Sequence, residues 1–214
     1  MLTALKTNNN REWFEANKKE FKTEEQKAKK FFNNVHQALQ QHDEVDKMKM
    51  FRIYRDVRFS ADKTPYKTHF SSSFHRVKPR LRGGYYLHIE PGNSFLATGF
   101  WNPEKSDLER IRREFAMDDE EIRHIMEQPE FKNTFGSLVG DELKTAPKGY
   151  DRDHKAIDLI RKKQYIATRK FTDKEVLDPD FAEVVNKSFR VIRPFFDYMS
   201  EVLTTDLNGI SLIE

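Results

Sequence analysis

The chain has 214 residues, of which 38 are Lys or Arg and 35 are Asp or Glu, so its formal net charge is only +3. A charge this close to balance does not by itself predict binding to nucleic acid or to a membrane. The lack of cysteine excludes disulfides, thiol catalysis and cysteine-ligated metal sites. With no signal-peptide pattern and no apolar run of about 18 residues, the sequence predicts a soluble cytoplasmic protein.

The N-terminal part predicts two helices. Residues 8–10 are asparagines that can cap a short helix in which Trp13 and Phe14 face inward. The capping-box spacing of residues 23–26 then predicts the start of a second helix that reaches about Gln41. Its apolar residues recur at helical spacing and indicate core packing rather than a partner groove: Ala28, Phe31, Phe32, Val35 and Leu39.

The periodicity then changes from helical to alternating. Four antiparallel strands are predicted, at residues 51–53, 70–74, 85–89 and 95–99, with turn residues at 91–93. A fifth strand is predicted at residues 164–171. The mixture of helices and antiparallel strands is typical of an α+β fold.

Further helices are predicted on both sides of the fifth strand. The first two cover residues 103–115 and 119–127, and a long loop at 136–153 leads to a short helix at 156–162. A C-terminal helix over residues 180–203 is expected to bend at Pro194. Because no repeat or flexible linker divides residues 1–214, we predict a single domain in which a mainly antiparallel sheet packs against the long N- and C-terminal helices.

Residues 51–69 form the densest group of charged and aromatic side chains in the chain. Guanidinium groups suit carboxylate or phosphate, and the cations of this segment outnumber its acids, Asp56 and Asp62. We therefore predict a site for a small anionic ligand, although pairing of these acids with the cations would explain the segment equally well. The predicted ligand-binding residues are Arg52, Arg55, Arg58, Lys63, Tyr66, Lys67, His69 and Asp153.

Acid–base chemistry is predicted from the strand at 85–89 and the loop near residue 154. Tyr86, His88 and Glu90 project from one strand face, where His88 and Glu90 can act as an acid–base pair, or can simply be solvated. Together with His69 they can also supply metal ligands, but without a motif such as His-Glu-x-x-His we assign none. His154 follows Asp153, which can cap the next helix. The predicted catalytic residues are His88, Glu90 and His154.

A nucleic-acid or protein-interaction module is the alternative function. Residues 76–82 form a basic loop, and aromatic residues lie nearby in the sequence, a combination that single-strand binders use. The cations are Arg76, Lys78, Arg80 and Arg82, and the aromatic residues are Tyr85, Tyr86, Phe100 and Trp101. The balanced total charge and the acidic residues at 118–121 favour a small ligand instead.

Four stretches give the chain a resemblance to a known family. They are Asn-Asn-Asn-Arg-Glu-Trp-Phe at 8–14, residues 52–60 with 62–69, Gly-Tyr-Tyr-Leu-His-Ile-Glu-Pro at 84–91, and residues 147–154. In these stretches the chain resembles the domain of unknown function 2461 family, conserved hypothetical proteins of bacteria and fungi. The resemblance implies no established reaction, substrate or cofactor. Lys155 departs from the family pattern, which commonly has proline after the Asp-His pair.

Overall fold

A five-stranded antiparallel sheet, in the order β1-β2-β3-β4-β5, forms the centre of the computed structural model, which describes residues 1–213. Its strands are β1 (Val45–Met50), β2 (Phe70–Arg76), β3 (Gly84–Ile89), β4 (Ser94–Phe100) and β5 (Tyr165–Phe171). The predicted α+β class with a mainly antiparallel sheet is therefore confirmed. Sequential strands are neighbours throughout, although residues 51–69 separate β1 from β2 and residues 101–164 separate β4 from β5.

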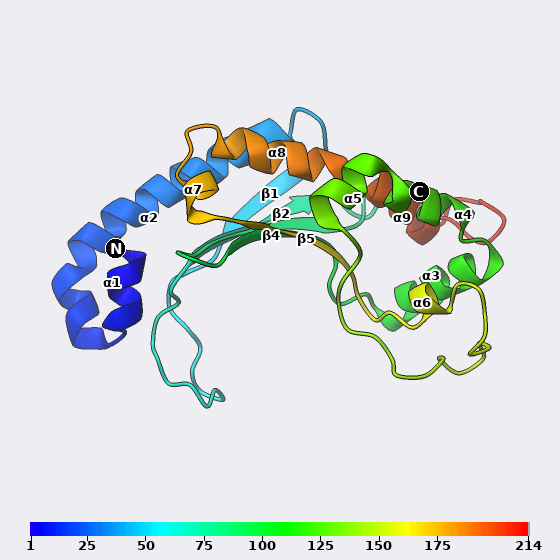
Figure 1. Cartoon of the computed structure of the whole chain (residues 1–214), viewed down its shortest axis with the longest axis horizontal. Coiled ribbons are helices and arrows are strands. Elements are labelled where there is room, and N and C mark those ends of the chain that lie inside the picture. The colour runs from blue at the N-terminus through cyan, green and yellow to red at the C-terminus, as the bar shows by residue number, and fades with distance from the viewer. Residues whose placement is uncertain (214) are drawn as a thin grey trace.

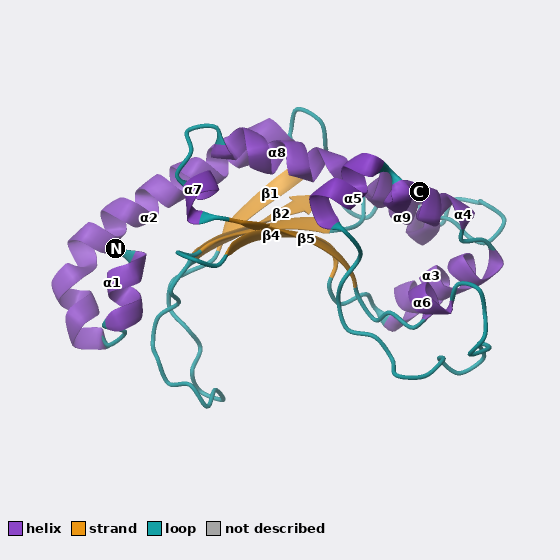
Figure 2. Cartoon of the chain, viewed as in Figure 1, coloured by secondary structure: helices purple, strands orange, loops and turns teal. Residues whose placement is uncertain are grey.

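Helices cover the convex face of this curved sheet (Figures 1 and 2). Not every helix lies on that face; in chain order the helices of the described residues are α1 (Leu2–Thr7), α2 (Arg11–Leu39), α3 (Lys105–Met117), α4 (Glu120–Glu127), α5 (Pro129–Phe135), α6 (Ile157–Ile160), α7 (Asp173–Val176), α8 (Phe181–Val191) and α9 (Arg193–Thr204). α2 and α8 lie side by side over the strands, and Phe189 of α8 packs on Phe74 and Tyr85. The predicted packing of the sheet against the N- and C-terminal helices is confirmed. Among residues 1–213, the structure contains no helix with both the length and the apolar character needed to span a membrane.

α2 is one continuous helix, so the predicted second start at residue 23 is wrong. Asn10 caps α2, because its side chain accepts a hydrogen bond from Trp13 N at 2.9 Å. The Thr23 hydroxyl does not cap a helix start but donates to Lys19 O at 3.2 Å, the bond that threonine forms inside a helix. The sequence spacing of a capping box is therefore present without its geometry.

Two other predicted elements lie elsewhere. The first strand is Val45–Met50 rather than residues 51–53, and its charged outward residues weaken the apolar alternation. The backbone leaves the sheet just after Phe51, whose N–H donates to Ser71 O at 2.9 Å. The predicted bent C-terminal helix is two helices that meet at Ile192, with Pro194 in the first turn of α9, where its missing N–H is tolerated. α5 was not predicted.

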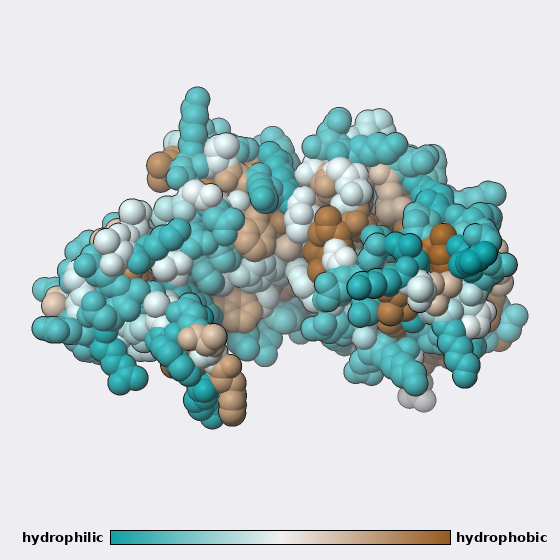
Figure 3. Space-filling model, turned by 60° about the horizontal axis from the view of Figure 1, so that its bottom comes forward, coloured by the Kyte–Doolittle hydropathy of each residue, from teal (hydrophilic) through white to brown (hydrophobic). Residues whose placement is uncertain are grey.

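The opposite, concave face of the sheet remains open between two projecting parts of the molecule (Figure 1). On one side hangs the loop of residues 51–69, here called the hairpin loop because Tyr54 and Tyr66 form a bridge between its arms. On the other side lies the lobe that contains α3 and α6. Figure 3 brings this face forward and shows a hollow between the two parts, with apolar residues in and beside it.

Candidate functional site

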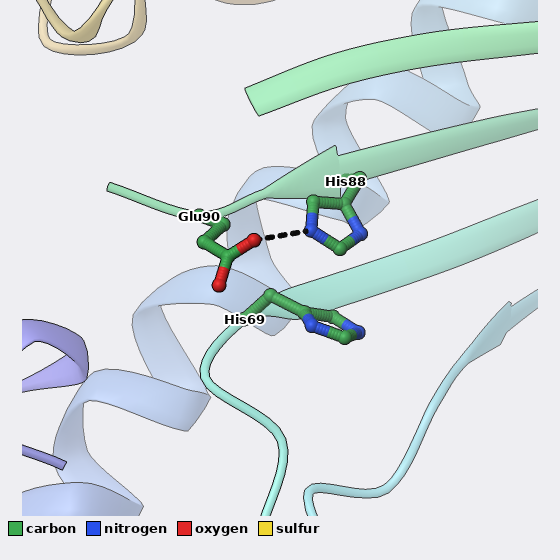
Figure 4. Close-up of side chains that lie close together, drawn as sticks. All are labelled: His69, His88 and Glu90. Atoms are coloured by element: carbon green, nitrogen blue, oxygen red, sulfur yellow. Dashed lines mark hydrogen bonds and ion pairs between the residues drawn. The ribbon is translucent and has the colours of Figure 1, made fainter. Parts of the chain in front are cut away.

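Three predicted site residues meet at one end of the concave face: His69, His88 and Glu90 (Figure 4). His88 lies on β3 and Glu90 directly follows it, so the alternation along the strand turns both toward the same face. β2 and β3 pair antiparallel with Phe70 opposite Ile89, which places the adjoining His69 beside Glu90. One ligand atom from each side chain lies within 4.8 Å of the other two.

Hydrogen bonds hold the Glu90 carboxylate from several sides. Thr68 donates to Oε1 at 2.5 Å, Asn93 donates to Oε2 at 2.9 Å, and His88 Nε2 lies 3.3 Å from Oε2. Burial acts to raise the pKa of Glu90, but these hydrogen bonds outweigh it and lower the pKa to about 2. Glu90 is therefore ionised at neutral pH although its side chain is only 12% exposed.

The protonation of His88 follows from its two neighbours. An ionised carboxylate can only accept, so Nε2 of His88 carries the hydrogen that faces Glu90. Nδ1 is then the acceptor, and the Tyr86 hydroxyl donates to it at 3.0 Å. Burial lowers the pKa of His88, while Glu90 opposes this effect. Tyr86, His88 and Glu90 thus form a chain of hydrogen bonds along one face of β3.

His69 is a half-buried imidazole that packs on His88. The ring centroids are 3.9 Å apart, and the opposite side of His88 stacks on Phe95 at 4.7 Å. Burial, followed by the neighbouring His88, lowers the pKa of His69 to about 4, so its ring is neutral at neutral pH. Between residues 1 and 213, no protein group forms a hydrogen bond with either ring nitrogen of His69. Its lone pair is available to a ligand.

Cations without acidic partners lie beside this cluster. Lys67 is close enough to His69 for its charge to lower the pKa of that histidine, and it lies over the Phe51 ring at 5.4 Å. Burial, together with the charge of Arg52, lowers the pKa of Lys67. Lys49 was not among the predicted ligand-binding residues, but it lies over the same Phe51 ring at 5.7 Å. Within the described residues, no carboxylate forms an ion pair with these three cations.

The other cations of the hairpin loop bond within it, so Arg55, Arg58 and Lys63 do not join Lys67 and His69 in one ligand site, contrary to the prediction. Arg55 pairs with Asp62 and with the Thr64 hydroxyl. Arg58 pairs with Asp56 at 2.6 Å, and Lys63 donates to Val57 O at 3.0 Å. The tip of the loop projects away from the sheet (Figure 1). Pairing with Asp56 and Asp62, which the sequence left as an equal alternative, describes Arg55 and Arg58, whereas Lys63 binds a backbone carbonyl.

The returning arm of the hairpin loop is fixed by the N-terminal region. The Asn9 side chain donates to Tyr66 O at 2.9 Å and accepts from Tyr66 N at 3.1 Å. The Tyr66 ring is buried and stacks on Phe14 with 4.0 Å between centroids. Tyr66, predicted to bind ligand, therefore lies in the core, where it supports the arm that carries Lys67 and His69.

A cavity of about 540 Å³ occupies the other half of the concave face. Its volume falls within the range of small-molecule sites, about 300–1,000 Å³. Tyr86 lines it and also contacts His88, and Phe51 lines it beside Tyr86, whereas His69, His88 and Glu90 do not line it. Other lining residues include Ser73, His75, Lys78 and Trp101.

His154 and Asp153 lie away from this cluster. They belong to the loop before α6, in the lobe on the far side of the concave face (Figure 1). His154 Nδ1 accepts a hydrogen bond from Ala156 N at 3.1 Å, while the side chain of Asp153 is 82% exposed beside Arg152. The expected approach of His154 to His88 and Glu90 is therefore wrong, and it is His154 rather than Asp153 that binds a backbone N–H near the start of α6.

The basic segment 76–82 does not form a free cationic loop, contrary to the alternative prediction. Arg76 lies on β2 with its side chain fully buried beside Asp43 and Asp197. Arg80 pairs with Glu44, and Arg82 pairs with Asp107. A polyanion would have to compete with these carboxylates.

In comparisons with known proteins, the chain matches a family profile. No curated protein and no solved structure matches the chain. The profile of one family, described as conserved hypothetical protein (DUF2461), matches residues 1–198. This match covers most of the chain and includes both the hairpin loop and the histidine cluster. The chain belongs to the DUF2461 family of conserved hypothetical proteins.

Proposed function

We propose that this protein is an enzyme for a small anionic substrate, which it binds on the concave face of the sheet. His88 and Glu90 carry out proton transfer or hydrolysis on that substrate, and Lys67 and Arg52 hold its phosphate or carboxylate group. The substrate class follows from the charges of the site, and the reaction class follows from its titratable pair.

The observation that carries this proposal is a buried His88–Glu90 pair beside a partly buried lysine that has no acidic partner among the described residues. A buried cation without a counter-ion is unfavourable, and an anionic ligand would relieve this. The depressed pKa of Lys67 is the expected sign of such a site.

The cavity supports the same proposal. Tyr86 lines it and also donates to His88, so a substrate there can exchange a proton with the Tyr86–His88–Glu90 chain. Trp101 and Phe51 offer aromatic surface for the body of the substrate. A nucleic-acid-binding module is not favoured, because Arg76, Arg80 and Arg82 already have carboxylate partners.

Anion binding is tested with two matched lysine variants. Lys67→Met should weaken the binding of inorganic phosphate, measured by calorimetric titration of chelator-treated protein, about 10-fold or more, because it removes a charged hydrogen-bond donor. Lys63→Met removes a lysine of the same hairpin loop that is exposed and bonded to Val57 O, and should leave binding unchanged. Equal binding by both variants and by the original protein would reject the site.

Catalysis is tested with chromogenic phosphate and carboxylate esters. We expect turnover of at least one ester class and a loss of about 100-fold or more in kcat for His88→Gln, the contribution typical of general acid–base catalysis. His124→Gln changes an exposed histidine of α4 and should have no effect. Turnover that is equally fast in the His88 variant would exclude His88 as the acid–base group.

A further inference from the structure

We propose that His69, His88 and Glu90 bind one divalent transition-metal ion, with two imidazole nitrogens and one carboxylate oxygen as ligands. The inference concerns the site of the proposed function, on which it rests for the chemical role of the ion. The binding of the ion stands on the geometry of the three side chains alone (Figure 4).

The spacing of two donor atoms already suits a metal ion. His88 Nε2 and Glu90 Oε2 lie 3.3 Å apart. Two atoms bound to one tetrahedral ion at about 2.0–2.1 Å are separated by about 3.3–3.4 Å. A hydrogen bond from a neutral N–H usually spans about 2.7–3.2 Å, so the contact between His88 and Glu90 is a long one. The same separation suits two ligands of one ion, which could replace this hydrogen bond.

His69 supplies the third donor. Its ring nitrogens have no hydrogen-bond partner among the described protein groups, and its donor atom lies within 4.8 Å of the other two. An ion can therefore bind His69 without breaking a hydrogen bond to the protein. A side-chain rotation brings the ring onto an ion that is shared with His88 and Glu90.

Residues around the ligands are placed as in metal sites. Thr68 and Asn93 hold the Glu90 carboxylate, and Tyr86 contacts the other ring nitrogen of His88. On metal binding, His88 would change tautomer, losing the proton of Nε2 and gaining one at Nδ1, whose N–H then donates to the Tyr86 oxygen, so the ring loses no net proton. Outer partners of this kind orient ligands and raise affinity.

The donor set indicates the class of ion and its role. Two imidazoles and a carboxylate suit Zn²⁺, Fe²⁺ or Mn²⁺ rather than Ca²⁺ or Mg²⁺, which prefer oxygen ligands. Three protein ligands leave a coordination position for water, as in catalytic sites. With an ion bound, His88 and Glu90 would serve as its ligands, and the metal-bound water would take over their part in the proposed reaction by attacking a substrate held by Lys67.

The test is a titration of chelator-treated full-length protein with Zn²⁺, and with Co²⁺ for its visible absorption. We expect one ion per chain, a rise in the melting temperature on saturation, and affinity lowered about 100-fold or more in His69→Gln and in Glu90→Gln. Tyr86→Phe should lower affinity about 10-fold to 100-fold, the effect of losing an outer partner. His75→Gln is the matched control, because His75 lies on neighbouring β2, bonded to Ser73 instead.

Each result has a defined meaning. Melting curves without metal show whether the variants are folded, so a loss of binding by a folded variant supports the site. Binding that survives both ligand substitutions, or that His75→Gln reduces equally, overturns it. If no ion binds while phosphate binding still depends on Lys67, the metal inference fails and the proposed function remains. If the ion binds but Lys67→Met leaves phosphate affinity unchanged, the metal inference holds and the proposed anion site fails.

Discussion

Arg76→Ala will destabilise the protein by about 3–5 kcal/mol, because breaking a buried ion pair leaves its partner buried and poorly compensated. The Arg76 side chain is fully buried, and its Nε lies 2.8 Å from Asp43, in an orientation suited to an ion pair rather than a hydrogen bond. Its other nitrogens bond Arg82 O, Ser200 and Asp197. One substitution thus removes contacts between the sheet, the end of α2 and α9.

Urea denaturation of the purified variant measures this loss. For a chain of this size, each kcal/mol corresponds to about 2–4 °C, so the melting temperature should fall by about 10 °C. Arg80→Ala is the control, because Arg80 and Glu44 form an ion pair with both side chains more than half exposed. Such a pair contributes at most about 1 kcal/mol. Comparable losses in the two variants would contradict the buried network.

Gly99→Ala will destabilise the protein by at least about 3 kcal/mol, because the added methyl group collides with a neighbouring strand. A Cβ at Gly99 would lie 2.1 Å from Tyr165 O, a backbone atom of β5. The backbone φ of +142° adds strain that glycine avoids. Gly99 also lines the cavity on the concave face, so a shift of β4 against β5 would deform the proposed substrate site.

Gly92→Ala separates the two causes. Gly92 has a φ of +76°, and a Cβ there meets nothing within 4 Å. Its substitution should therefore show only the backbone penalty, about 1–2 kcal/mol. Thermal and urea unfolding of both variants give the difference that is due to the collision. If Gly99→Ala were no worse than Gly92→Ala, the close approach of β4 and β5 at this position would be wrong.

The sequence predicted β2 to β5 close to their observed positions. In β2 and β3 the apolar residues recur at every second position because one face packs on helices, and in β3 this alternation also placed Tyr86, His88 and Glu90 together. Arg76 occupies the next inward position of β2 after Phe70, Ser72 and Phe74, so extending the strand by two residues would have removed it from the predicted loop. β1 was not predicted, because Lys47 and Lys49 lie on the open side of the sheet and leave the strand with few strongly apolar residues.

The cationic part of the site could not be resolved from the sequence. Which arginines are neutralised depends on the path of the hairpin loop, which brings Asp62 to Arg55 across seven positions. The contact of His69 with Glu90 depends on the register of β2 and β3, and a shift of one residue would turn one strand's side chains to the other face. Residue composition identified the right segment, and long-range pairing determined which of its members remain free.

The hydrogen bonds between Asn9 and Tyr66 join two of the stretches that carry the family resemblance, residues 8–14 and 62–69, into one structural unit. The Asn9 amide donates to Tyr66 O and accepts from Tyr66 N, as the backbone of a neighbouring strand would. The two residues are 57 positions apart in the sequence. The arm that presents Lys67 and His69 is therefore braced from a point close to the N-terminus. Substitutions within residues 8–14 are therefore expected to displace Lys67 and His69, although they change no side chain of the ligand site itself.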